Sequence, residues 1–131
     1  MRILIVEDNV DLYNDYIIRI FGNLLPMDRL EIQHASKIEE AITNLAQPWD
    51  VILMDYNIGK PHSSPEGAKV RNGGDLVELV RSMEQGTNRH SFIIGTANNQ
   101  VGNREMVAKG ADTSYLKLHV VEMAREIEQR L

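Results

Sequence analysis

Charged and hydroxyl side chains stand at the ends of four short apolar runs in this sequence. Two adjacent carboxylates, Glu7 and Asp8, follow the first run, and a third carboxylate, Asp55, ends another. A hydroxyl group, on Thr96, and an ammonium group, on Lys117, end two runs further along the chain. Carboxylates that lie close together repel one another unless a cation neutralises them, and Mg²⁺ prefers such oxygen ligands. The pattern therefore predicts a Mg²⁺ site beside a hydroxyl and an amine.

Five short aliphatic runs alternate with five amphipathic stretches of helical length. The predicted strands are residues 2–6, 30–34, 50–55, 91–96 and 113–117. The predicted helices are residues 11–24, a stretch from Ser36 that stops before Pro48, and residues 75–83, 100–109 and 120–131. Ser36 and Glu39 have the spacing of a capping box, in which two side chains satisfy amide groups at a helix start. Residues 56–72 are typical of a loop, with a turn signal at Asn72-Gly73.

Strands that are apolar nearly throughout and alternate with helices are typical of a parallel sheet covered on both faces. The expected fold class is α/β, a flavodoxin-like (βα)5 doubly wound sandwich with a parallel five-stranded sheet in order 2-1-3-4-5. In such sheets the ligand crevice lies outside the carboxyl ends of the strands. The five charged and hydroxyl side chains at the ends of the apolar runs are therefore expected to meet there. For any one acid the simpler explanation is a helix cap, a role open to Asp8 or Asn9.

Composition narrows the classes of function further. The 131 residues include no cysteine, which excludes disulfides, thiolate metal sites and thiol catalysis. The formal net charge is −5 and the isoelectric point is about 5.3, whereas a DNA-binding domain usually carries a basic stripe. The apolar runs are too short to span a membrane, and no signal peptide precedes the first strand. We therefore expect a single cytoplasmic domain over residues 1–131, with no direct nucleic-acid partner and no membrane partner.

Four segments carry a more specific pattern. They are Ile3-Leu4-Ile5-Val6-Glu7-Asp8-Asn9, Val51-Ile52-Leu53-Met54-Asp55, Ile93-Ile94-Gly95-Thr96-Ala97, and Gly110-Ala111-Asp112 followed by Tyr115-Leu116-Lys117. Together they resemble the receiver domain of two-component response regulators, a family that includes the chemotaxis regulators. The resemblance spans the whole chain and includes all five of the chemical side chains.

The resemblance implies a phosphoacceptor and a metal site. Asp55 matches the aspartate that takes a phosphoryl group from a histidine kinase or a phosphotransfer protein. The three carboxylates match the family's Mg²⁺ site, in which Asp8 would be a direct ligand, Glu7 would act through water and Asp55 would contribute as well. The main-chain carbonyl of Asn57, two residues after the acceptor, matches a further ligand of the family.

The same resemblance gives roles to the other two side chains. Thr96 would turn its hydroxyl to a phosphoryl oxygen, and Lys117 would supply a second cation. A receiver of this kind catalyses only its own phosphorylation and dephosphorylation and is otherwise not an enzyme. It would signal by contact with a downstream protein that the sequence does not identify. The sequence does not decide whether the chain forms a homodimer.

Three features depart from the family pattern. Leu118 stands where the family usually has a proline after the lysine, so we expect a rearranged loop around Lys117. Ser114 stands where the family has its switch aromatic, and Tyr115, one residue on, is expected to point to the opposite face of the strand. An insertion at about residues 60–72 lengthens the loop after the acceptor and carries a positive net charge, as expected of a partner or gating surface.

Two other functions agree with parts of the sequence. A pseudo-receiver interaction module, which keeps the fold but has lost its switching, is favoured by Ser114 and Leu118 and opposed by the five intact side chains. A small Mg²⁺-dependent phosphatase-like enzyme would need an Asp-x-Asp motif after the first strand. The chain has Glu7-Asp8-Asn9-Val10 there, so this alternative is the weaker one.

The remaining residues with chemical potential have ordinary interpretations. No metal-ligand spacing links the four histidines, which are expected in surface or loop positions: His34, His62, His90 and His119. Trp49 follows a proline in a turn and is expected to pack rather than to bind a ligand.

Overall fold

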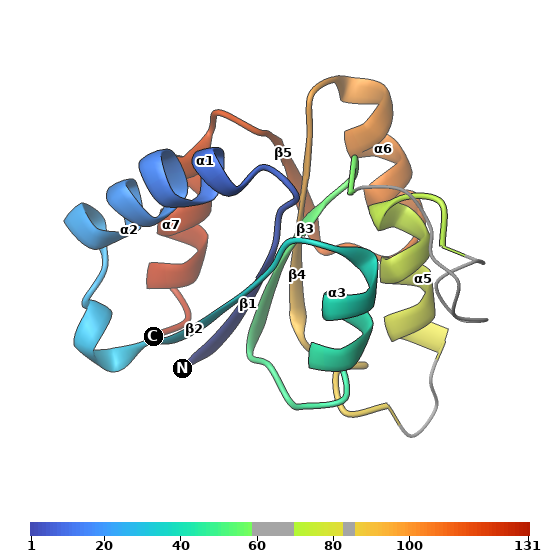
Figure 1. Ribbon diagram of the computed structural model, residues 1–131, viewed down its shortest axis with the longest axis horizontal. Coiled ribbons are helices and arrows are strands. Elements are labelled where there is room, and N and C mark those ends of the chain that lie inside the picture. Colours follow the sequence, from blue (N-terminus) through green and yellow to red (C-terminus); the bar gives the residue numbers. More distant parts are fainter. Residues whose placement is uncertain (59–69, 83–85) are drawn as a thin grey trace.

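A five-stranded parallel sheet forms the centre of the computed structural model, which describes residues 1–58, 70–82 and 86–131. The strands are β1 Arg2–Val6, β2 Glu31–Ala35, β3 Val51–Asp55, β4 Phe92–Ala97 and β5 Thr113–Leu116. Their order is β2-β1-β3-β4-β5, which confirms the order that the sequence predicts. Because every strand runs in the same direction, the carboxyl ends of all five lie at one edge of the sheet (Figure 1).

Helices cover both faces of this sheet (Figure 1). One face is covered by α1 Val10–Leu12, a π-helical turn Tyr13–Ile17, α2 Ile18–Leu24 and α7 Val120–Glu128. The other face is covered by α3 Ile38–Asn44, α5 Gly73–Ser82 and α6 Gln100–Ala108. A short 3₁₀ turn, Met27–Arg29, precedes β2. In the part of the chain that the structure describes, no helix is both long and apolar enough to cross a bilayer.

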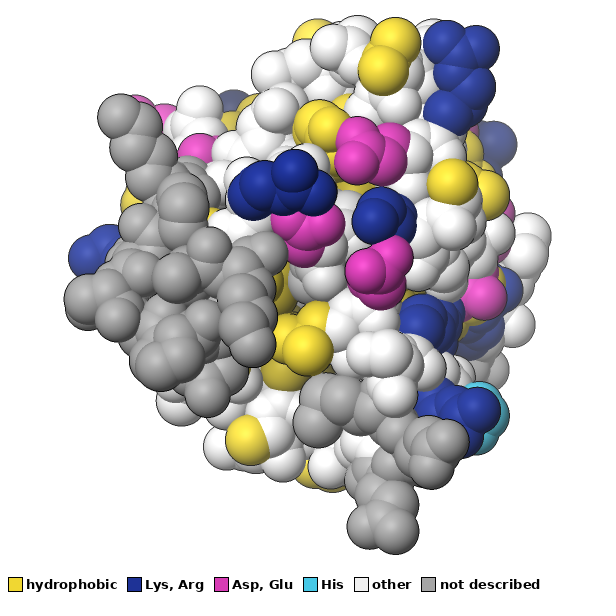
Figure 2. Space-filling view, turned by 90° about the vertical axis from the view of Figure 1, so that its right-hand side faces the viewer, with side chains coloured by type: hydrophobic (Ala, Val, Ile, Leu, Met, Phe, Trp, Pro, Cys, Tyr) yellow, Lys and Arg dark blue, Asp and Glu magenta, His cyan; other side chains and the backbone are white. Residues whose placement is uncertain are grey.

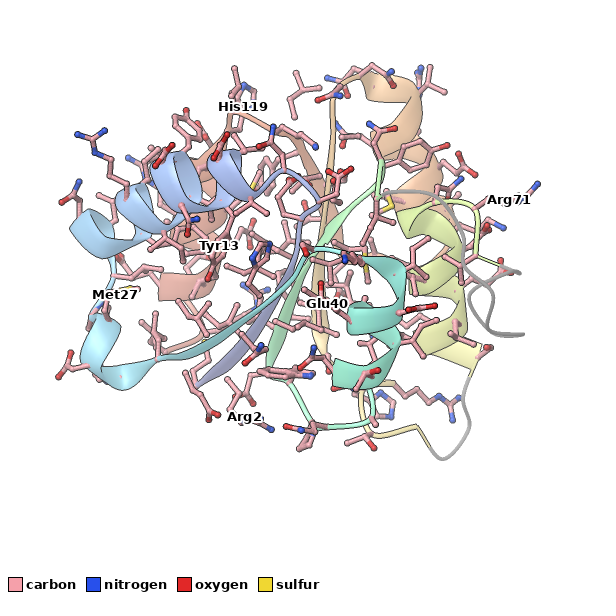
Figure 3. All side chains as sticks on the ribbon, viewed as in Figure 1. Arg2, Tyr13, Met27, Glu40, Arg71 and His119 are labelled. Carbon is pink, nitrogen blue, oxygen red and sulfur yellow. The ribbon has the colours of Figure 1, made fainter. Side chains whose placement is uncertain are left out.

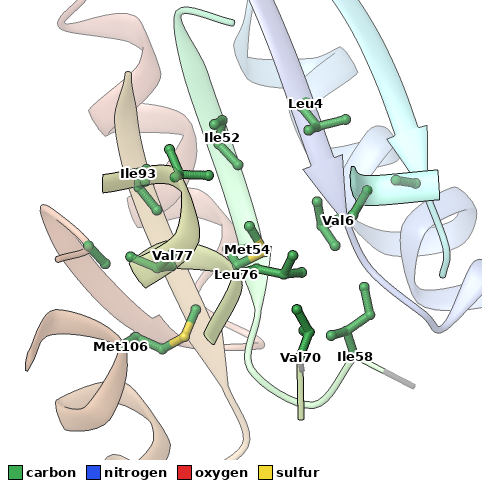
Figure 4. Packing of buried hydrophobic residues seen from close by; sticks show 14 of the residues in the cluster. Leu4, Val6, Ile52, Met54, Ile58, Val70, Leu76, Val77, Ile93 and Met106 are labelled. Carbon is green, nitrogen blue, oxygen red and sulfur yellow. The ribbon is translucent and has the colours of Figure 1, made fainter. Parts of the chain in front are cut away.

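The described residues form two hydrophobic clusters, one on each face of the sheet, because the central strands are apolar on both sides. All five residues of β3 are buried. Figure 4 shows the cluster beneath α3 and α5, where Ile58 and Val70 lie close to Met54 and Leu76. Ile58 and Val70 are each 3% exposed, so the chain enters and leaves residues 59–69 from the core. The predicted insertion at 60–72 lies almost wholly outside the described residues.

Several predicted element boundaries need correction. The second strand ends at Ala35 rather than at residue 34, and the third helix begins at Gly73 rather than at residue 75. The predicted capping box is wrong: Lys37 is the cap residue of α3, and Ser36 bonds through its amide and its hydroxyl to the Glu40 carboxylate. Ser36 pairs with Glu40 rather than with Glu39 because α3 begins one residue later than the polar pattern of the sequence implies.

The first helix also differs from the continuous helix expected at residues 11–24. It begins at Val10, passes through the π-helical turn and continues as α2. Asn9 caps it, since its side-chain oxygen accepts a hydrogen bond from the Leu12 amide at 2.9 Å. Asn9, and not Asp8, therefore takes the capping role that the sequence left open, and the Asp8 carboxylate is not used for it.

Candidate functional site

Four strand ends bring the predicted site residues to one edge of the sheet. Asp55, the last residue of β3, lies in register with Thr96 on β4. Glu7 directly follows β1, and its amide donates to the carbonyl of Ala35 at 3.0 Å. β5 ends at Leu116, one residue before the strand end that the sequence predicts, so Lys117 directly follows it, and its amide donates to the carbonyl of Ala97 at 3.0 Å. The parallel ladders therefore continue just far enough to fix the backbone of each residue.

Three carboxylates form an acidic cluster there. Carboxylate oxygens of Glu7, Asp8 and Asp55 all lie within 4.8 Å of one another. Glu7 is 2% exposed and Asp55 is 0% exposed, whereas Asp8 is exposed. An exposed acid above two buried ones leaves one side of the cluster open to solvent. Carboxylate oxygens in this arrangement are ligands that suit Mg²⁺, which usually keeps several of its waters.

The two oxygens of Asp55 have different surroundings. Oδ1 accepts a hydrogen bond from the Asn57 amide at 3.0 Å and lies 3.2 Å from the Lys117 ammonium nitrogen. Oδ2 has no hydrogen-bond partner among the described residues, although it is buried. Burial, followed by the negative charge of Glu7, raises the pKa of Asp55 to about 8, against the opposing effect of Lys117. A buried carboxylate oxygen without a hydrogen-bond donor costs free energy, so Asp55 in this state does not stabilise the fold.

Lys117 links the buried acids. Its ammonium nitrogen lies 3.3 Å from Glu7 Oε2 and 3.2 Å from Asp55 Oδ1. Burial alone would lower the pKa of Lys117, but the charges of Asp55 and Glu7 raise it above its ordinary value. Leu118 is 66% exposed, and its carbonyl accepts a hydrogen bond from the Tyr16 hydroxyl at 2.9 Å. Lys117 therefore reaches the site with Leu118 in place of proline and with every described peptide bond trans.

Two predicted residues take part through their backbones. The carbonyl of Thr96, which is 6% exposed, accepts a hydrogen bond from the Tyr56 amide at 2.8 Å. Asn57 approaches the acceptor through its amide, as described above. The role of its carbonyl as a metal ligand therefore stays a prediction, as does the contact of the Thr96 hydroxyl with a phosphoryl group.

Sequence reasoning missed the way in which α5 packs against the end of β3. A Cβ atom on Gly73 would lie 2.1 Å from the carbonyl oxygen of Asp55, so only glycine allows this approach. The Gly73 amide also donates to the carbonyl of Tyr56 at 2.9 Å. The Asn72-Gly73 pair predicts a turn, but the sequence contains no signal for which segment the glycine must approach.

A second missed residue is Tyr56, which directly follows Asp55. Its hydroxyl donates to the Glu105 carboxylate on α6, and this bond raises the pKa of Tyr56. Its ring lies against the first turn of α6, where a Cβ on Gly102 would come within 3.0 Å of it. Tyr56 therefore connects the end of β3 with α6.

The aromatic residue of β5 has the orientation that the sequence predicts. Ser114 donates a 2.5 Å hydrogen bond to the Asn103 side chain of α6 on one face of the sheet. Tyr115 packs in the cluster on the other face and donates to Glu126 at 2.7 Å. No ring from β5 therefore stands between Asp55 and α6.

Of the histidines and the tryptophan, His34 is the exception to the ordinary interpretation. It lies within β2, is half-buried and stacks on Tyr13, so the surface or loop position expected for it is wrong. His90 and His119 are exposed outside the strands and helices, as expected, and His62 lies outside the described residues. Trp49 is 5% exposed, which confirms that it packs in the core.

The outer face of α5 and α6 carries charges of both signs (Figure 2). Arg71 pairs with Asp75 at 3.3 Å, and Lys109 pairs with Glu78 at 2.9 Å. These pairs lie near the surface and contribute little to stability. They do not form a single-sign surface that would attract a nucleic acid.

An apolar cavity of about 220 Å³ lies away from the strand ends, between α3 and α5. Ile42, Leu45 and Val80 are among the residues that line it. Its polar side chains are those of Thr87 and Asn88, and Asn88 already uses its amide to donate to the carbonyls of Leu45 and Gln47. No charged side chain of the described residues lines this cavity, so the acidic cluster is the candidate site.

Solved structures of one kind resemble the chain over almost its whole length. The receiver domain of a response regulator from Rhodospirillum rubrum matches with a TM-score of 0.76 and 13% identity, over 98% of this chain and 94% of that one. The signal receiver domain of a DNA-binding response regulator from Colwellia psychrerythraea 34H matches with a TM-score of 0.73 and 20% identity, over 99% and 97%. The chemotaxis response regulator CheY4 of Vibrio cholerae matches with a TM-score of 0.69 and 22% identity, over 98% and 96%.

Sequence comparisons add no relative. No protein-family model matches the chain, and no curated protein matches it. The structural likeness is nevertheless consistent across many solved receiver domains and agrees with the strand order observed here. This chain has the fold of the receiver domains of two-component response regulators.

Proposed function

We propose that this chain is a phosphoacceptor receiver domain in a two-component phosphorelay, with Asp55 as the acceptor. The observation that carries the proposal is the state of the Asp55 carboxylate. It is wholly buried at the end of the central strand, beside a lysine, and one of its oxygens has no hydrogen-bond partner in the described part of the chain. A purely structural carboxylate at this place would be expected to have both oxygens satisfied.

The proposed reaction transfers a phosphoryl group to this carboxylate. An Asp55 oxygen forms the new bond to phosphorus, while the bond between phosphorus and a histidine nitrogen of the donor breaks, and the nitrogen keeps the electron pair. The product is an acyl phosphate, and attack of water on phosphorus later returns the carboxylate and inorganic phosphate. The chain thus catalyses only its own phosphorylation and dephosphorylation.

The acidic cluster has the donor set for a divalent cation. We propose that Asp8 and Asp55 ligate Mg²⁺ directly, that Glu7 acts through water, and that the carbonyl of Asn57 completes the protein's share. The burial of Asp55 and the close approach of three carboxylates support this assignment, because they raise the energy of the metal-free site. When bound, Mg²⁺ would neutralise oxygens of the incoming phosphoryl group.

Two side chains would act on the phosphoryl oxygens. Lys117 lies beside Asp55 Oδ1 in the resting state, and its cation can turn to the new oxygens when they arrive. Thr96, in register with Asp55 on the next strand, can donate its hydroxyl to one of them. Phosphoryl transfer depends mainly on such positioning and charge neutralisation.

The proposed partners follow from this chemistry. The donor is a histidine kinase or a phosphotransfer protein, and the signal passes by contact to a downstream protein. We place the chain in the cytoplasm, without direct contact to nucleic acid. A homodimer is compatible with the proposal but is not required by it.

Binding of beryllofluoride, a mimic of the phosphoryl group, tests the assignment. With Mg²⁺ it should shift the backbone amide resonances of residues 7–9, 55–57, 96 and 117 in the wild type. It should leave Asp55→Asn unchanged. A folded wild type that binds Mg²⁺ but not beryllofluoride would instead indicate a pseudo-receiver, the alternative that the Ser114–Asn103 hydrogen bond favours.

A further inference from the structure

The main-chain carbonyl of Glu7 has an unusual partner. In the parallel pairing of β1 with β2, the Glu7 amide still donates to Ala35, and the next amide of this pattern would be that of Lys37, which is instead the cap residue of α3. Among the described residues the ladder therefore ends without a backbone donor for the Glu7 carbonyl. The side chain of His34 replaces it, with Nε2 at 2.8 Å from the carbonyl oxygen. Because a carbonyl only accepts, this contact assigns the ring proton to Nε2.

The ring of His34 is held in turn by Tyr13. The two rings stack with centroids 3.7 Å apart and planes inclined by 10°. Tyr13 begins the π-helical turn, and its amide donates to the carbonyl of Asn9 at 3.0 Å. In Figure 3 the Tyr13 side chain lies between the first helix and the sheet. A closed circuit of contacts thus runs from Glu7 through the turn to Tyr13, across to His34, and back to Glu7.

This circuit encloses the turn formed by residues 7–9, which carries two of the three clustered carboxylates. Mutual repulsion of these carboxylates tends to open the turn. Asp8, which is exposed, meets the side chain of Asp55, but no ion pair with a described residue resists this opening. The position of its carboxylate therefore depends on the backbone of the turn, which β2 holds at the Glu7 amide and, through His34, at the Glu7 carbonyl.

We propose that His34 is a positioning residue for the metal site: its Nε2–H group holds the Glu7 carbonyl, and Tyr13 holds its ring. The inference rests on the proposed function, because it assigns His34 to the same Mg²⁺ site. His34 does not touch the cation. It acts on the backbone that presents Asp8 and Glu7, as outer groups around metal ligands commonly do.

Two substitutions at this position separate the hydrogen bond from the ring. His34→Phe keeps a flat ring that can stack on Tyr13 but has no donor. His34→Gln places an amide nitrogen the same number of bonds from Cα, so it keeps the donor on a flat group. We expect Mg²⁺ affinity to fall about tenfold in His34→Phe, the lower end of such outer-shell effects, and to recover most of that loss in His34→Gln. His90→Phe, at an exposed histidine remote from the acidic cluster, is the control and should leave the affinity unchanged.

The measurement is a Mg²⁺ titration followed by the amide resonances of residues 7–9 and 55–57, with urea unfolding of each variant in EDTA as the check on folding. The ¹⁵N spectrum of the wild-type imidazole supplies a readout that does not depend on any variant, and it should show the proton of His34 on Nε2. A folded His34→Phe with wild-type affinity, or a ring protonated on Nδ1, would overturn the proposal. If the wild type does not bind Mg²⁺ at all, the proposed function fails, whereas the tautomer still decides whether His34 holds Glu7.

Discussion

The two edges of the sheet treat buried polar groups in opposite ways. At the amino edge, Asn88 is 3% exposed and fully satisfied: its amide donates to two carbonyls, and its oxygen accepts from the Trp49 amide at 2.7 Å. Ser91 is 8% exposed, and its hydroxyl donates to the carbonyl of Trp49 at 2.6 Å. At the carboxyl edge, Asp55 is more deeply buried and one of its oxygens has no partner among the described residues.

The difference separates buried polar groups that stabilise the fold from one that does not. At the amino edge, a side chain whose hydrogen-bonding groups are all paired connects distant segments of the chain. Its removal leaves several backbone groups unpaired. A buried carboxylate with an unpaired oxygen at the carboxyl edge is expected to lower stability, and under the proposed function it serves as nucleophile and metal ligand. Buried polar residues of similar exposure are therefore expected to change the free energy of unfolding in opposite directions. Substitutions can test this directly.

The largest effect is expected at the amino edge. Asn88→Ala removes hydrogen bonds to Leu45, Gln47 and Trp49 and should lower the free energy of unfolding by about 3 to 4 kcal/mol. Urea unfolding measures this loss, and Mg²⁺ affinity should stay unchanged. Asn23→Ala, at an exposed position on α2, is the matched control and should change stability by less than about 0.5 kcal/mol. A loss below about 1 kcal/mol for Asn88→Ala would contradict the role assigned to this edge.

A methyl group placed against the acceptor strand should have the next largest effect. Gly73→Ala puts a Cβ against the carbonyl of Asp55 and should cost about 2 to 3 kcal/mol, because the helix or the strand end must shift. Gly22→Ala is the control: nothing lies within 4 Å of its Cβ, and alanine in this helix should gain about 0.5 to 1 kcal/mol. Equal effects of the two substitutions in thermal unfolding would mean that α5 does not support the acceptor.

Removal of the Asp55 charge should stabilise the metal-free chain. Burial raises the pKa of Asp55 to about 8 in the folded state, above its ordinary value in the unfolded chain. The folded state therefore binds the extra proton, and the stability that this proton contributes is fully present below the unfolded pKa and is lost as the pH rises through about 8. Asp55→Asn lacks this loss, so in EDTA it should be more stable than the wild type by about 1 to 3 kcal/mol at pH 8.

The gain should shrink toward zero near pH 4, where the carboxyl is protonated in both states. Denaturant unfolding across this range provides the comparison. A pH-independent gain would attribute the effect to packing rather than to charge. A destabilised Asp55→Asn at pH 8 would contradict the claim that this buried carboxylate lowers stability.

The smallest effect concerns two tyrosine–glutamate pairs on opposite faces of the sheet. Tyr56→Phe and Tyr115→Phe each remove one hydroxyl bond to a carboxylate and should each cost about 0.5 to 1.5 kcal/mol. Only Tyr56 follows the acceptor and contacts α6. Tyr56→Phe should therefore change the amide shifts that beryllofluoride causes in α6, whereas Tyr115→Phe should leave them as in the wild type. The same shifts in both variants would mean that Tyr56 only packs.

The sequence alone predicts the scaffold and the position of the five site residues well. Apolar runs with Glu7, Asp55, Thr96 and Lys117 at or next to their carboxyl ends are local patterns, and parallel pairing brings such ends together. The boundaries of α3 and α5 differ because side-chain pairs such as Ser36 with Glu40 and the approach of Gly73 to β3 depend on tertiary packing.

Other features depend on contacts between distant segments and have no local signal. The Asn88 side chain meets residues 45, 47 and 49, which lie about 40 positions away. His34 takes over a carbonyl only because the β1–β2 ladder ends where it does. The unpartnered oxygen of Asp55 is likewise a property of the assembled site, and no pattern of residue types could predict it.

The most direct test of the central claim is intact mass after incubation with acetyl phosphate and Mg²⁺. Asp50 provides the matched control, since it immediately precedes β3 while Asp55 ends it. The wild type and Asp50→Asn should each gain the mass of one phosphoryl group, and Asp55→Asn should gain none. Equal modification of Asp55→Asn, or an unmodified wild type that binds Mg²⁺, would contradict the account.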